Sequence, residues 1–209
     1  MSVIPLQHNI EYPESDGQPM AESDVHADEM IYLRFALREH FRQVPDVYVA
    51  GNLFLYFERG NPRAVVAPDS FVVKGAPKTP RKTYLLWEEG RVPCFVAEVT
   101  SRSTQGEDLS SKKTCYERLG IEEYFLFDPL GDYLAPRLQG FRLFDGRYER
   151  LLPRAGALES RTTGVTLRAE GERLRLIDTA TGAPYLRPEE NADEVARLRN
   201  ELERLRKSD

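Results

Sequence analysis

The spacing of apolar positions changes several times along the chain, and each change predicts a different element. Residues 1–21 are polar and interrupted by prolines and glycines, which indicates an irregular N-terminal arm. Apolar residues then recur at helical spacing from residue 24 to residue 42, between a capping Ser23 and Pro45. The pattern predicts one amphipathic helix at the start of the ordered domain.

A β pattern follows this helix and continues to residue 100. It consists of four stretches rich in β-branched and aromatic residues, namely VYVAGNLFLYF, AVVAPDSFVVK, TYLLWEE and VPCFVAEVT. Turn-forming residues separate them. We therefore expect four strands in succession, arranged as a bent antiparallel meander.

A second helix is predicted from Leu109 to Leu119, with Asp108 as its N-terminal cap. Leu109, Lys112, Tyr116 and Leu119 recur at helical spacing, and Gly120 is placed to end the helix. The apolar strand EEYFLFDP follows. A strand, a helix and a strand in this order predict a right-handed crossover with two parallel strands.

The last part of the chain contains two hairpin patterns and a heptad pattern. GFRLFDGRYERL and VTLRAEGERLRLID predict hairpins in a small β appendage at about residues 138–180. In the tail, residues 188–209, leucine and valine follow a 3-4-3 spacing typical of a short coiled coil. The expected organisation is a mixed α/β (α+β) domain over residues 22–187, with the hairpin appendage inside it and a C-terminal helix after it.

Composition limits the function classes. The chain has 209 residues, of which 41% are hydrophobic, enough for one domain with its own core. No apolar run approaches the roughly 20 residues that span a bilayer, and the N-terminus lacks a secretory pattern, so we expect a cytoplasmic protein without membrane contact. The two cysteines and three histidines show no metal-binding spacing, which excludes a structural zinc site.

Charge distribution adds one hint about partners. The net charge of −5 argues against broad adhesion to nucleic acid. Between residues 74 and 118, however, Lys and Arg outnumber Asp and Glu. A mildly basic segment within an acidic protein suits a polyanionic substrate that meets one face, although scattered solvated charges would give the same count.

The acid Glu98 interrupts the apolar run FVAEVT and needs an explanation. A carboxylate taken out of water without a partner costs several kcal/mol. Asp69 is a second acid at the start or bend of another apolar stretch, and a hairpin-like excursion could bring the two together. Two adjacent carboxylates repel unless a cation lies between them, and Mg²⁺ or Mn²⁺ suits oxygen ligands. We therefore predict Asp69 and Glu98 as metal ligands.

Lys112 supplies a third charged group. At 100° per residue it falls inside the apolar stripe of the second helix, while Lys113 lies toward the edge of that stripe. An ammonium on the core side needs an anionic target, and this helix directly follows the strand that carries Glu98. Together the three groups suit phosphodiester hydrolysis, in which a metal ion activates water and a lysine offsets phosphate charge.

The order of these motifs resembles the PD-(D/E)xK nuclease superfamily and, more narrowly, the bacterial Uma two (Uma2) family of restriction endonucleases. The resemblance rests on Pro68-Asp69, Glu98-Val99-Thr100-Ser101, Asp108 with Lys112 and Tyr116, GIEEY at residues 120–124, and Asp128-Pro129. One departure from the superfamily motif is that Thr100 replaces the lysine two positions after the acid. The family carries that lysine on the following helix, at the position of Lys112.

The resemblance implies a restriction-endonuclease-like core, with a mixed bent sheet flanked by helices. It also implies an endonuclease that depends on Mg²⁺ or Mn²⁺, acts on DNA and uses no nucleotide cofactor. A homodimer is expected as well, because duplex cleavage uses two sites and the heptad tail favours a partner. The rival hypothesis is a non-catalytic nuclease-fold binding or scaffold protein that acts through its oligomer interface. Net acidity favours the rival, and the intact acid–acid–lysine set opposes it.

The candidate residues also have simpler structural interpretations, and several further residues are weaker candidates. Asp69 could be a simple turn residue and Lys112 could extend its charge into water. His26 lies on the apolar stripe of the first helix, where a core histidine is the commoner outcome. Further supporting candidates are Glu22, by resemblance an acid near the metal, and Thr100 and Lys113. The possible phosphate contacts are Lys74, Lys78, Arg81 and Lys82.

Overall fold

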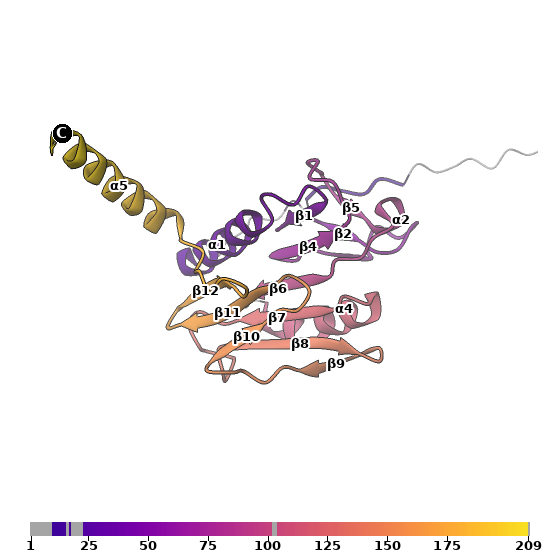
Figure 1. The fold of residues 1–209 in the computed structure, drawn as a ribbon. Helices are drawn as coiled ribbons and strands as arrows, with labels where there is room; N and C mark the ends of the chain where they lie inside the picture. The colour runs from indigo at the N-terminus through magenta and orange to yellow at the C-terminus, as the bar shows by residue number, and fades with distance from the viewer. Residues whose placement is uncertain (1–9, 16, 18–22, 102–103, 209) are drawn as a thin grey trace, which may run out of the picture.

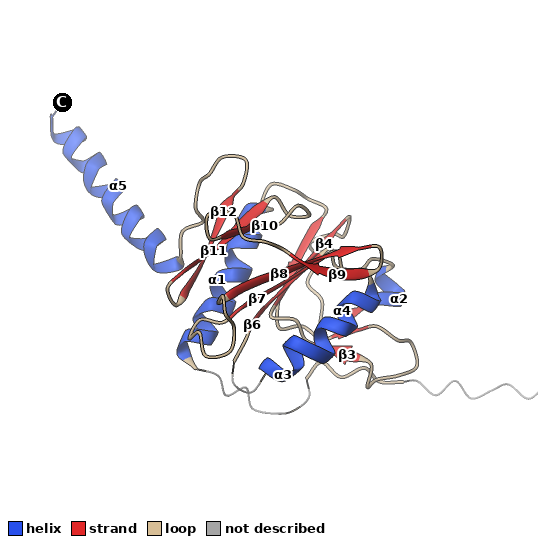
Figure 2. Cartoon of the chain, turned by 90° about the horizontal axis from the view of Figure 1, so that it is seen from below, coloured by secondary structure: helices blue, strands red, loops and turns tan. Residues whose placement is uncertain are grey.

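The computed structural model describes residues 10–15, 17, 23–101 and 104–208. A six-stranded mixed sheet runs through the middle of the domain, with helices on both faces (Figure 1, Figure 2). Its strands, in spatial order, are β1 Val47–Ala50, β4 Ser70–Lys74, β6 Phe95–Val99, β7 Glu123–Phe127, β8 Leu138–Phe144 and β9 Arg147–Arg150. β6 and β7 are parallel and the other neighbours are antiparallel, which confirms the predicted pair of parallel strands.

Helix α1, Asp24–His40, covers one face of this sheet. Its N-terminus is capped as predicted, since the Ser23 hydroxyl accepts a hydrogen bond from the backbone N–H of His26 at 3.3 Å. Leu33 and Leu37 of its apolar stripe are fully buried, and the helix packs against β1, β4, β6 and the later strand β12, Arg173–Asp178. The helix thereby presents its N-terminal turn toward the start of β4.

The opposite face of the sheet carries the second helical stretch. It comprises α3 Gln105–Glu107, the π-helical turn η1 Asp108–Lys112, and α4 Lys113–Leu119. Gly120 ends it with a φ of 77°, as the sequence predicts. The π-helical turn was not predicted. It widens the helix locally and leaves Leu109 42% exposed, so the expected apolar repeat is wrong at its first position.

The predicted four-strand meander is only partly right. β2 Leu55–Tyr56, β3 Val65–Val66 and β5 Tyr84–Leu85 leave the main sheet and form a small sheet of their own. The chain departs after β1 at Asn52, whose φ is 50°. The expected strand TYLLWEE changes after β5 into the short helix α2, Leu86–Glu89.

The segment expected as a β appendage is built into the domain instead. β8 and β9 belong to the six-stranded sheet and form the hairpin predicted from GFRLFDGRYERL, with its turn at Asp145-Gly146. A third sheet consists of β10 Ala157–Glu159, β11 Val165–Glu170 and β12 Arg173–Asp178. Its side chains Leu167 and Leu176 are fully buried in the same core as α1. This sheet therefore helps to hold α1 in place.

Helix α5, Pro188–Ser208, extends away from the domain, as the upper left of Figure 1 shows. Within the described part of the chain, no helix is long and apolar enough to cross a membrane.

Candidate active site

Asp69 and Glu98 meet because of the register between β4 and β6. Ser70 pairs with Ala97 in this antiparallel ladder, so the preceding Asp69 stands opposite Glu98. The backbone N–H of Asp69 donates to Glu98 Oε2 at 3.1 Å, and the N–H of Val99 donates to Asp69 Oδ2 at 2.7 Å. Each acid is thus fixed by the backbone beside the other.

Both acids lie where ionisation is costly. Glu98 is 1% exposed, and the side chain of Asp69 is 15% exposed. Burial raises the pKa of Glu98, and burial together with the charge of Glu98 raises the pKa of Asp69 well above its usual range. The pair therefore favours a proton or another cation between its oxygens.

Lys112 is the cation that the described residues supply to this pair. Its Nζ lies 3.3 Å from Glu98 Oε2 and 2.9 Å from Asp108 Oδ1. Although burial lowers the pKa of Lys112, the surrounding carboxylates outweigh burial and raise it, so the amine stays charged. The cluster combines three carboxyl groups with one ammonium, so its net charge is negative when all four groups are ionised.

Tyr116, one turn after Lys112, completes the contacts of Glu98. Its buried hydroxyl donates to Glu98 Oε1 at 2.6 Å. Glu98 therefore has a donor at each oxygen, and its carboxylate is held in one orientation.

The neighbouring Lys113 faces elsewhere. Its Nζ lies 3.8 Å from the centroid of the Phe141 ring, over β8, and so does not reach the acids. The structure thus brings together Asp69, Glu98 and Lys112 and leaves Lys113 outside the cluster.

The remaining supporting candidates are placed in different ways. The buried His26 lies beside the cluster, with Nε2 3.9 Å from Asp69 Oδ2. Thr100 is buried at the end of β6, and its hydroxyl has no hydrogen-bond partner among residues 23–101 and 104–208. Glu22 lies outside the described residues.

A pocket of about 240 Å³ opens next to Asp69, between α1 and the end of β1. Arg34 of α1 lines it together with Gly51 and Asn52. A side chain at Gly51 would collide with the backbone oxygen of Asp69, so glycine is required there. Arg34 is half-buried, and burial lowers the pKa of its guanidinium. It forms no hydrogen bond or ion pair with any other described residue, which makes it available to an anion.

The four basic residues expected to contact phosphate do not approach the acids. Lys78 donates to carbonyl groups at the C-terminal end of α1, whereas the cluster lies at the N-terminal end, about 22 Å away at 1.5 Å per residue. Arg81 binds a carboxylate of α2 at 2.5 Å, and Lys82 pairs with Glu14 at 2.7 Å. Lys74 ends β4, about 17 Å along the strand from Asp69.

Three residues at the site were missed or misread from the sequence. Asp108 was interpreted as a helix cap, but it lies inside the helical stretch and is 1% exposed. The sequence predicts Tyr116 only as part of the apolar repeat and of the family motif, and it gives no prediction for Arg34. A signal was available for two of them: Asp108, Lys112 and Tyr116 are spaced four residues apart, which places them on one face of a helix.

The residues present fit a magnesium-type ion. Asp69 and Glu98 offer hard oxygen ligands in a cluster that lacks positive charge. Among the described residues, no three His, Cys, Asp or Glu side chains are placed to hold a metal ion together. Two carboxylates are nevertheless what Mg²⁺ commonly takes from a protein, because water and substrate phosphate supply its other ligands.

Comparison with known proteins identifies the family of the chain and supports its fold. The profile of the family Uma2, described as "Putative restriction endonuclease", matches residues 4–169. Among solved structures, the chain is similar to a "putative nuclease belonging to DUF820" from Anabaena variabilis ATCC 29413. The two chains are 12% identical with a TM-score of 0.50, over 69% of this chain and 76% of that chain. No curated protein matches the sequence. The structural similarity supports a restriction-endonuclease-like fold.

Proposed function

The chain belongs to the Uma2 family of putative restriction endonucleases, and we propose that it is a metal-dependent endonuclease that hydrolyses phosphodiester bonds in DNA. The observation that carries this proposal is the convergence of Asp69, Glu98 and Lys112 on one buried cluster. The direct test is nicking of supercoiled plasmid by the purified protein with Mg²⁺. Mg²⁺ binding without nicking of DNA would favour the non-catalytic scaffold instead.

In this proposal Asp69 and Glu98 hold the ion, and Lys112 acts on the substrate. A bound Mg²⁺ would lower the pKa of a coordinated water and offset phosphate charge. Lys112 would turn from the acids toward the reacting phosphate, where its ammonium stabilises the negative charge of the transition state. Tyr116 keeps the Glu98 carboxylate oriented throughout.

Arg34 would bind a neighbouring phosphate of the DNA backbone. Its half-buried guanidinium lines the pocket beside Asp69 and has no anionic partner among the described residues. Arginine is well suited to phosphate because its donors form a planar fork. This contact would place the scissile bond over the acids.

We also propose a homodimer as the working form. Cleaving both strands of a duplex requires two cuts, and a symmetric pair of chains supplies two sites. The protruding helix α5 is the element that best supports pairing.

Metal binding should depend on Asp69. In a calorimetric titration with Mn²⁺, we expect Asp69→Ala to weaken binding by more than ~10-fold, because one of the two carboxylate ligands is lost. Glu107→Ala is the matched control, since Glu107 is an exposed acid next to Asp108 in the sequence. Binding that survives in Asp69→Ala would remove this acid from the metal site.

DNA affinity should depend on Arg34. We expect Arg34→Ala to weaken binding of a fluorescent duplex by roughly 10-fold and to reduce the salt dependence by about one phosphate contact. The measurement is fluorescence anisotropy in EDTA, so that no cleavage occurs. Arg42→Ala, on an exposed arginine just past the far end of α1, should change affinity little. Equal losses in the two variants would mean that Arg34 has no special contact.

A further inference from the structure

Helix α5 carries an apolar stripe that no described part of the chain covers. Val195, Leu198, Leu202 and Leu205 are between 45% and 61% exposed. Their 3-4-3 spacing places them on one side of the helix, at the a and d positions of two heptads. A stripe of this kind is stabilised when a second helix buries it.

The charges beside this stripe indicate what the second helix is. Glu194 and Glu201 occupy the g positions, and Arg199 and Arg206 occupy the e positions. In a parallel pair of identical helices, each g residue faces the e residue five positions later on the other helix. Glu194 then meets Arg199 of the second copy, and Glu201 meets Arg206 of the second copy. An antiparallel pair would instead place glutamates against glutamates and arginines against arginines.

The arginines are available for such contacts in the single chain. Arg199 and Arg206 form no ion pair with any other residue of the described chain. Glu194 and Glu201 both pair with Arg197, at 2.7 and 3.3 Å, on the exposed surface of the same helix. Exposed pairs of this type contribute little to stability, so they do not prevent contacts with another helix.

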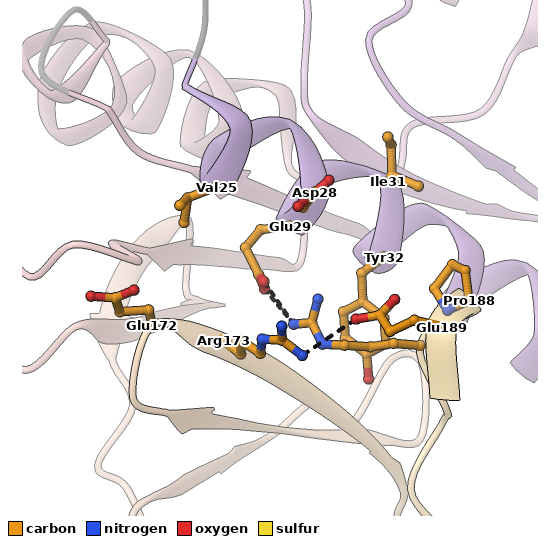
Figure 3. A pocket seen from close by; sticks show the side chains of 10 residues that line it. Val25, Asp28, Glu29, Ile31, Tyr32, Glu172, Arg173, Pro188 and Glu189 are labelled. Carbon is orange, nitrogen blue, oxygen red and sulfur yellow. Dashed lines mark hydrogen bonds and ion pairs between the residues drawn. The ribbon is translucent and has the colours of Figure 1, made fainter. Parts of the chain in front are cut away.

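The base of α5 is firmly attached to the domain, as Figure 3 shows around Pro188. Arg187, just before the helix, binds both carboxylate oxygens of Glu29 at 2.7 and 2.8 Å, and the two side chains are each 3% exposed. Arg173 of β12 pairs with Glu189 in the first turn of α5 at 3.3 Å. The direction of α5 is therefore set by the domain, and a parallel pair would hold both domains at the same end.

We infer that α5 pairs with α5 of a second copy as a parallel two-stranded coiled coil, in the register set by the g-to-e contacts of Glu194 with Arg199 and Glu201 with Arg206. This specifies the geometry of the homodimer in the proposed function. Two heptads are near the lower limit of stability, so we expect a dimer that dissociates on dilution.

The register is tested by charge exchange in the full-length protein. Sedimentation should show that Glu194→Arg/Glu201→Arg, which places arginine at every flanking position, weakens dimerisation by at least ~10-fold relative to wild type. Adding Arg199→Glu/Arg206→Glu to the same chain restores the g-to-e attraction and should restore the dimer. A control exchange at Glu203, on the far side of the helix, should change little.

The orientation is tested by cross-linking. With Cys115 replaced by serine, Leu205→Cys places one thiol at a d position, which faces its own copy in a parallel pair. A disulfide-linked dimer is then expected on mild oxidation. In an antiparallel pair the two thiols would lie about 15 Å apart along the helix axis and could not bond.

The possible outcomes separate the two proposals. A wild-type protein that is monomeric at all concentrations would overturn both the homodimer and the α5 pairing. A dimer that is unaffected by the charge exchanges, or that fails to cross-link, would overturn only the α5 pairing. Nicking activity is measured separately, so neither result is confused with loss of the catalytic site.

Discussion

Glu98→Gln is expected to lower the single-turnover rate of plasmid nicking by on the order of 10³-fold or more. The amide has nearly the same shape as the carboxylate but lacks its negative charge, so the proposed metal ligand is lost. Glu98 is 1% exposed and has a donor at each oxygen, so bulk water has little access to its position. The readout is conversion of supercoiled to open-circular plasmid in Mg²⁺, with Glu107→Gln as the matched control.

The same variant should not be less stable than wild type at neutral pH, which separates loss of chemistry from loss of fold. The pKa of Glu98 is raised by burial, so the folded protein retains a proton that the unfolded chain releases above about pH 4.3. Rising pH therefore lowers the stability of wild type from that point until the folded-state pKa is passed. The amide avoids this cost, and we expect its melting temperature at pH 8 to equal or exceed that of wild type. A folded, metal-binding Glu98→Gln protein that nicks at the wild-type rate would contradict the assignment of Glu98.

Lys112→Met is expected to lower the nicking rate by ~10²–10³-fold while leaving Mn²⁺ binding intact or tighter. The methionine retains the length of the side chain but cannot offset charge on the phosphate. Because the ammonium also lies near the proposed metal ligands, its removal leaves their negative charge less compensated and favours a divalent ion. Loss of activity with unchanged or improved metal affinity is a combination that simple unfolding does not produce.

Lys113→Met is the matched control for this experiment. It makes the same substitution one position later, on a side chain that lies over Phe141 rather than near the acids. We expect nearly wild-type nicking from it. If the two variants lose activity equally, the lysine acts through general charge on the helix and not through a contact with the reacting group. Some destabilisation of Lys112→Met is expected, because Asp108 loses its buried partner.

The central features of the site could be predicted because they depend on local rules. Because side chains alternate along a strand, Glu98 points to the opposite face of the sheet from Phe95. The helical pattern places Lys112 on the core side of its helix. The proximity of Asp69 and Glu98 could be predicted because it needs only that their two strands are neighbours in the sheet. The structure adds the exact register, with each acid bonded to backbone beside the other.

Other features depend on packing between distant segments, which local patterns do not encode. The third sheet, β10–β12, looked like an appendage because its hairpin pattern is self-contained, yet its leucines share the core of α1. Arg34 lies on a helix far from the acids in sequence, and only the fold opens a pocket between it and Asp69. Charge alone suggested that the loop bearing Lys78 and Arg81 contacts phosphate. In the structure Lys78 binds a carbonyl group at the C-terminal end of α1, and Arg81 binds a carboxylate of α2.

The π-helical turn Asp108–Lys112 is the part of the candidate site that a small change to the chain would alter first. The turn contains one residue more than a regular helix would need. Deleting a single residue there, such as the exposed Ser110, would let the segment relax into ordinary helix, with Asp108 three positions before the lysine instead of four. The two side chains would then be about 60° apart around the helix axis, so Asp108 would rotate away from Lys112. The strands and the buried face of α4 would stay as they are, and the lysine would keep its contact with Glu98 but lose the one with Asp108.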